Sequence, residues 1–187
     1  MKLSAHKDLK NAITDLPVKE KDRLLLRLIA KDKVLTEHLH YKLLEDESDL
    51  ENRKEKIKAD VEDQLADLKK LNAKEALVKV RKMITTVNHF YKVTKDPIGE
   101  VELKIYILNI VPFDYRKSTL GYRDYMILFS AFYLKTVAIT INKFKKLHED
   151  LQYDLSENLN NLLTKIYSSK LASSAEASNL HLPKEIN

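Results

Sequence analysis

Aromatic and basic residues gather in one stretch of this 187-residue chain, from Lys104 to Leu147. Eight of its fourteen Phe and Tyr residues lie between Tyr106 and Tyr133. Eight Lys and Arg residues stand against two acids between Lys104 and Leu147, although the whole chain carries a net charge of only +5. Such a stretch is either the core of the fold or a binding surface.

Five side chains of segment 113–125 are of the types that bind nucleic acid: Tyr115, Arg116, Lys117, Tyr122 and Arg123. Arginine and lysine neutralise phosphates, and tyrosine rings stack on unpaired bases. Aromatic residues at helical spacing are, however, also typical of a protein core, with tyrosine hydroxyls at its rim. The segment therefore predicts a binding site without excluding a structural role.

Several other chemistries have no sequence motif here. Gly99 and Gly121 are the only glycines, so neither a phosphate-binding P-loop nor a dinucleotide-binding fingerprint can be formed. The absence of cysteine excludes disulfides, thiol catalysis and cysteine-ligated zinc. We find no serine-hydrolase or zinc-protease motif. The sequence predicts no catalytic residue and no cofactor.

Metal binding has two weak candidates. Glu37 and His40 form one Glu-x-x-His motif, but di-iron bundles need two such motifs and further glutamates. The acids between residues 45 and 63 could hold Mg²⁺ for a metal-dependent phosphohydrolase. Pairs such as Glu55 with Lys58 instead favour a solvated helix face. We predict no metal ligand and keep the phosphohydrolase as a third hypothesis.

The composition favours helices, because two glycines and four prolines leave few positions for tight turns. We expect an all-α fold of about seven helices, in a bundle or a short helical stack. Apolar periodicity predicts helices over residues 3–13, 17–29, 34–44, 48–71, 73–95, 101–111, 122–147 and 154–166. Residues 101–111 also alternate as a strand would, and we choose the helix because no partner strand is visible.

The central prediction is an antiparallel hairpin over residues 48–95. Ser48 and Glu51 form a capping pair that opens its first helix. Narrow apolar seams run along residues 50–71 and 77–91, and a tight corner at Asn72 joins them. We expect the aromatic helix 122–147 to pack in the middle of the fold.

Helices 17–29 and 34–44, with the short corner between them, resemble one unit of a HEAT-type helical repeat. The resemblance covers about thirty residues, and no second copy follows at a fixed period. It implies a pair of packed helices and no particular activity. We expect residues 1–171 to form a single domain, and the Ser- and Ala-rich residues 172–187 to form a flexible tail.

The start of the chain is polar, and we expect a cytoplasmic protein. The longest apolar run, Met126–Ile141, is sixteen residues long and includes Lys135, which is short of the roughly 20 residues that span a bilayer. We therefore expect no membrane span. Without a convergent catalytic set, our first hypothesis is a non-catalytic helical module that binds a protein partner, with homo-oligomerisation left open. Nucleic-acid binding through segment 113–125 is the alternative.

Overall fold

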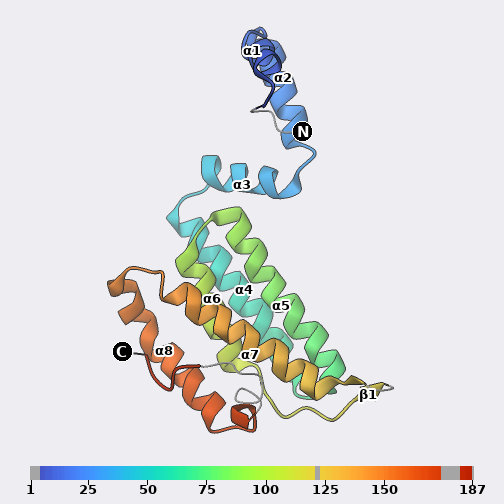
Figure 1. The fold of residues 1–187 in the computed structure, drawn as a ribbon, viewed down its shortest axis with the longest axis vertical. Coiled ribbons are helices and arrows are strands. Elements are labelled where there is room, and N and C mark those ends of the chain that lie inside the picture. Colours follow the sequence, from blue (N-terminus) through green and yellow to red (C-terminus); the bar gives the residue numbers. More distant parts are fainter. Residues whose placement is uncertain (1–4, 121–122, 174–181, 187) are drawn as a thin grey trace. The chain divides into compact units, whose positions relative to one another are not determined.

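The computed structural model describes residues 5–120, 123–173 and 182–186, and they are mostly helical, as the sequence predicts (Figure 1). The chain divides into two compact units, Met1–Glu45 and Asp46–Asn187. We call them the N-terminal unit and the bundle unit. The single domain over 1–171 and the flexible tail stay predictions. Within that tail, residues 174–181 and 187 lie outside the described residues.

The N-terminal unit contains three helices, α1 (Lys7–Thr14), α2 (Val18–Ile29) and α3 (Lys33–Leu44). They correspond to the first three predicted helices. Pro17 precedes α2, where its missing N–H leaves no lost hydrogen bond. Asp32 caps α3 by accepting a hydrogen bond from the Leu35 amide at 3.0 Å.

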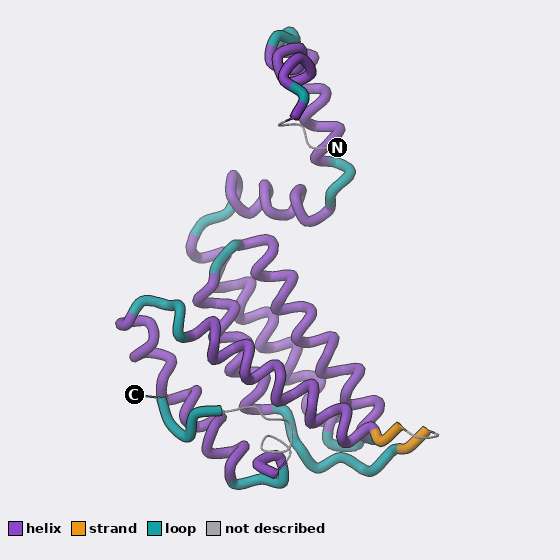
Figure 2. Tube along the Cα trace, viewed as in Figure 1, coloured by secondary structure: helices purple, strands orange, loops and turns teal. Residues whose placement is uncertain are grey.

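The predicted antiparallel hairpin forms the first half of the bundle unit, as Figure 2 shows. Its helices are α4 (Glu47–Leu68) and α5 (Ala73–Thr94). The predicted cap at Ser48 is wrong by two residues. Asp46 caps α4, because its carboxylate accepts from the Ser48 amide at 2.8 Å and from the Asp49 amide at 3.2 Å. A carboxylate also interacts favourably with the positive end of a helix.

Helix α6 (Pro97–Ile110) confirms that residues 101–110 are helical rather than extended. The helix begins four residues before the predicted start, because Asp96 accepts a hydrogen bond from the Ile98 amide at 3.0 Å. Pro97 occupies the first turn, where proline is well tolerated. Residues 97–100, between the two predicted helices, therefore form the first turn of α6.

Two further boundaries differ from those predicted. Helix α7 (Tyr125–Phe144) begins after a two-stranded hairpin, β1 (Thr119–Leu120) and β2 (Arg123–Asp124). Asp124 caps α7 by accepting from the Met126 amide at 2.8 Å. Helix α8 (Glu149–Tyr167) starts five residues before the predicted 154, directly after His148.

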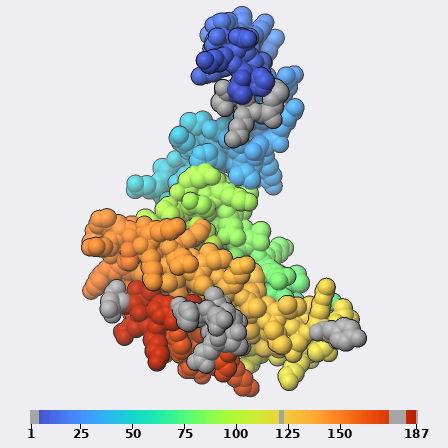
Figure 3. Space-filling model, viewed as in Figure 1, coloured from blue at the N-terminus to red at the C-terminus, as the bar shows by residue number. Residues whose placement is uncertain are grey.

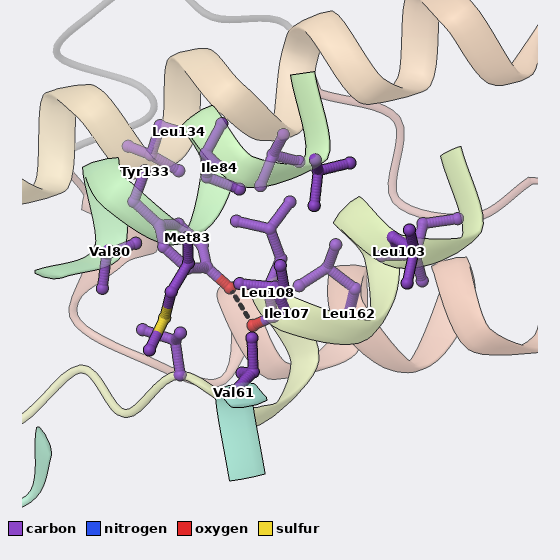
Figure 4. Packing of buried hydrophobic residues seen from close by; sticks show 14 of the residues in the cluster. Val61, Val80, Met83, Ile84, Leu103, Ile107, Leu108, Tyr133, Leu134 and Leu162 are labelled. Carbon is purple, nitrogen blue, oxygen red and sulfur yellow. Dashed lines mark hydrogen bonds between the residues drawn. The ribbon is translucent and has the colours of Figure 1, made fainter. Parts of the chain in front are cut away.

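Helix α6 lies in the middle of the bundle unit and packs against α4, α5, α7 and α8, whereas the aromatic helix α7 packs mainly against α5 and α6. The prediction that the aromatic helix occupies the middle is therefore wrong, although α7 contributes large side chains to the core. Phe129 and Tyr133 of α7 are fully buried, with ring centroids 6.1 Å apart. The Tyr133 hydroxyl donates a hydrogen bond of 2.5 Å to the Leu108 carbonyl of α6 (Figure 4). Buried aromatic residues of 122–147 are therefore structural.

One helix of the described chain, α7, is long and apolar enough to cross a membrane by length and composition alone. Core helices of soluble proteins pass the same test, and 44% of its apolar window is buried inside the unit. The opposite side of α7 lies on the surface of the bundle unit (Figure 3). Ile127 on that side is 67% exposed.

Candidate functional site

Tyr115, the first predicted binding residue, points into the protein. Its side chain is buried, and its ring contacts the ring of Phe129 edge-on at 5.0 Å. Burial raises the pKa of its hydroxyl, which finds no hydrogen-bond partner among the described residues. A ring in this position anchors the loop to the core and offers no face on which a base could stack.

Arg116 ties the loop to the corner between α4 and α5. Its guanidinium donates to the Lys70 carbonyl at 2.7 Å, and its own carbonyl accepts from the Ala73 amide at 3.0 Å. Asn72 and Arg116 form an isolated parallel bridge. The guanidinium is exposed but already has a structural partner.

Lys117 and Arg123 are exposed, as a phosphate-binding role requires. Tyr122 lies outside the described residues. The contact between Arg116 and the α4–α5 corner brings a second group of exposed cations to the same end of the unit: Lys69, Lys70 and Lys74. We call these lysines, together with Arg116, Lys117 and Arg123, the basic corner. The sequence did not indicate the three lysines, because they are about fifty residues away from the loop in the chain.

A polar cleft of about 360 Å³ opens between α4, α6 and α8. Its floor includes Ile105 and Leu155, and its walls carry polar side chains from all three helices. These polar lining residues are Lys58, Glu102, Tyr106, Asn109, Asn158 and Asn161.

An ion-pair network neutralises the cleft. Glu102 accepts from Lys54 at 3.0 Å and from Lys58 at 2.9 Å. These contacts lower the pKa of Glu102 against the opposing effect of its burial. The Tyr106 hydroxyl donates to Glu62, and burial together with that carboxylate raises the pKa of Tyr106 to about 12. The two charged side chains that line the cleft, Lys58 and Glu102, are therefore paired with each other.

Lys165 of α8 is a partly buried cation at the C-terminal end of α6. Its ammonium donates to the carbonyls of Asn109 at 2.5 Å and Val111 at 2.8 Å, and it lies 4.4 Å from the Phe113 ring centroid. Burial lowers the pKa of Lys165 to about 8. The side chain thus caps the C-terminus of α6 with a partly buried charge.

This lowered pKa predicts a pH dependence of stability. Between about pH 8 and pH 10.5 the unfolded lysine keeps its proton while the folded one loses it, so stability should rise with pH through that window. Across this window we expect the free energy of unfolding of the wild type to rise by about 1–2 kcal/mol more than that of Lys165→Met. The rise is smaller than the full pKa shift implies, because the side chain keeps some solvent contact. Urea titrations of both proteins at several pH values measure this difference. A constant difference across the window would contradict it.

No group of three or more His, Asp or Glu side chains converges on a possible metal position in the described part of the chain. His40 Nδ1 lies 2.8 Å from a Glu45 carboxylate oxygen. The acids of α4 are spread round the helix, and several pair with lysines, as Glu55 does with Lys58 at 3.0 Å. The phosphohydrolase hypothesis has no structural support from these residues.

The N-terminal unit has an unusual surface. None of its described residues, 5–45, is buried. Leu25 and Leu28 of α2 lie one turn apart on the same side of the helix, and they are 56% and 52% exposed. We call these two residues the leucine face. Leu43 and Leu44 at the end of α3 are also exposed. The apolar periodicity of helix 17–29 predicts a buried stripe of Leu24, Leu25, Leu28 and Ile29. In the structure Leu24 and Ile29 are half-buried, whereas Leu25 and Leu28 are exposed.

Comparison of the chain with protein-family models, with curated proteins and with solved structures finds no match.

Proposed function

We propose that this protein is a non-catalytic helical module that binds another protein, and that its N-terminal unit supplies the main binding surface. The observation that supports this is the leucine face of α2, whose two side chains are each more than half exposed. An amphipathic helix is stable when its apolar stripe is buried. Contact with a partner would bury this one.

The partner should present an apolar groove or an apolar helix face. Fully burying one leucine contributes roughly 1.5–3 kcal/mol, so a few such side chains can supply much of a binding free energy. Helix-in-groove recognition uses this spacing of apolar side chains along one helix. No catalytic arrangement is needed for that role.

Two substitutions that each introduce a negative charge test this proposal. Leu25→Glu with Leu28→Glu should weaken binding at least tenfold, because two carboxylates would have to enter an apolar interface. Val78→Glu with Ile127→Glu is the matched control, since both residues are exposed apolar positions of the bundle unit. Proteins captured from a cell extract would be purified and titrated by calorimetry against the wild type and each of the two double variants. Equal affinity for the leucine pair and the wild type would contradict the proposal.

Nucleic-acid binding is the second candidate, and the basic corner is the observation in its favour. Buried Tyr115 removes one of the predicted stacking rings, which leaves electrostatic contacts as the main contribution. Anisotropy of labelled oligonucleotides is the measurement, with Lys117→Glu and Arg123→Glu combined as the variant. Those positions avoid Arg116, whose contacts are structural. Binding that falls steeply with salt and is lost in the variant would favour this candidate.

A further inference from the structure

Residues 182–186 lie on α8, where helix side chains bind their backbone. The Asn160 side-chain amide donates to the Ile186 carbonyl at 3.0 Å, and the Asn160 side-chain oxygen accepts from the Ile186 amide at 2.8 Å. The Tyr167 hydroxyl donates to the Leu182 carbonyl at 2.6 Å. One carboxamide thus satisfies both backbone hydrogen-bonding groups of a single residue.

The chain bends at Lys184, and the hydrogen bonds hold the backbone of the two end residues, Leu182 and Ile186. A carboxamide offers a donor and an acceptor side by side, which match the N–H and C=O that one residue of an extended chain presents on the same side. Pro183 restricts its own backbone and that of Leu182 to extended conformations. The hydrogen bonds themselves are independent of side-chain identity.

Side-chain selectivity comes from the two ends of the segment. Leu182 and Ile186 are partly buried against the core cluster, whereas Lys184 and Glu185 are exposed. The surface therefore selects an apolar residue followed by proline, then two residues of free choice, then a second apolar residue.

From these contacts we propose that the face of α8 around Asn160 and Tyr167 is a binding surface for a short peptide of another protein, with the pattern leucine, proline, two polar residues, isoleucine, and with a bend after the proline. The chain's own residues 182–186 occupy this surface and compete with that peptide. The proposal is independent of the leucine face, because it uses a different unit and a different kind of partner segment.

The bound segment can be displaced because few contacts hold it. They comprise three hydrogen bonds from side chains of α8 and the partly buried side chains of Leu182 and Ile186. A tethered segment acts at an effective concentration on the order of millimolar. A partner that makes further contacts outside the pattern can displace the tethered segment. A short free peptide competes with that segment only weakly.

The test uses the full-length chain with Leu182→Ser and Ile186→Ser, which vacates the surface. The ¹⁵N-labelled variant is titrated with the acetylated hexapeptide of residues 182–187, Leu-Pro-Lys-Glu-Ile-Asn. We expect saturable shifts of the Asn160 side-chain amide signals, with a dissociation constant of about 0.1–1 mM. The wild-type chain should bind about 2- to 10-fold more weakly, because its own segment competes at a millimolar effective concentration. Ile186→Ser alone replaces the double variant if circular dichroism shows lost helix.

Adding Asn160→Leu to the vacated chain should abolish the shifts, whereas adding Asn161→Leu should leave them. Asn161 is the matched control, as an exposed asparagine of the same helix that lines the polar cleft instead. Absence of saturable shifts in the vacated chain, or equal loss with both asparagine changes, would overturn the proposal. Light scattering that shows a wild-type dimer, broken by Asn160→Leu, would make a second copy the occupant and overturn the assignment to another protein.

Discussion

Replacing Glu100 with alanine is expected to lower the free energy of unfolding by about 3–5 kcal/mol. Glu100 is only 2% exposed and holds two lysines, Lys104 at 2.6 Å and Lys143 at 2.5 Å. Lys104 is itself buried. Without Glu100 its charge would stay in the protein interior with no carboxylate beside it, which is the most destabilising way to break a buried ion pair.

Two variants separate this mechanism from a loss of packing. Lys143→Met should change stability by about 1 kcal/mol or less, because the Lys143 side chain is 38% exposed. Combining Glu100→Met with Lys104→Met should recover most of the loss, since no buried charge remains. Urea unfolding followed by circular dichroism measures the free energy of unfolding of these two variants, of Glu100→Ala and of the wild type. If Glu100→Ala stays within about 1 kcal/mol of the wild type, the buried ion pair is not a major determinant of stability.

Phe129→Ala is expected to lower the free energy of unfolding by about 3–5 kcal/mol. Phe129 is fully buried, and its ring lies 5.0 Å from that of Tyr115 and 6.1 Å from that of Tyr133. Alanine would leave a cavity and remove both ring contacts, including the one that anchors segment 113–125 to the core.

Ile127→Ala is the matched control on the same helix. Its side chain is 67% exposed, so its truncation should change stability by less than about 0.5–1 kcal/mol. The pair also tests whether the aromatic residues of this stretch belong to the core or to a binding surface. Similar small losses for Phe129→Ala and Ile127→Ala would contradict the assignment of Phe129 to the core.

The core role of the aromatic helix illustrates what sequence reasoning could and could not decide. Spacing placed Phe129 and Tyr133 on one helix face, which indicates a core, and both are buried. Tyr115 lies in a loop without periodicity, so nothing in the sequence distinguished a stacking ring from an anchor. The folded structure shows that Tyr115 is an anchor, because its ring packs against Phe129 of α7.

Helix boundaries show a similar division. Asn72 is a strong local signal, and α5 begins directly after it as predicted. Pro97 opens α6, which begins four residues before the predicted start. At the start of α4, Asp46 and Ser48 are both residue types that are preferred at helix N-caps, so the local sequence does not choose between them. Asp46 caps the helix in the folded chain, and the Ser48 hydroxyl donates to its carboxylate at 2.7 Å.

The sequence by itself determined the all-α class and the antiparallel hairpin of α4 and α5, because helix propensity and apolar spacing are properties of neighbouring residues. It also identified Lys117 and Arg123 as cations of the candidate loop, and the structure shows that both are exposed. Only the tertiary structure decided that Tyr115 is buried, that the leucine face of α2 is exposed, and that Asn160 binds the backbone of Ile186. These outcomes depend on segments far apart in the chain, and burial is a property of the packed fold rather than of local sequence.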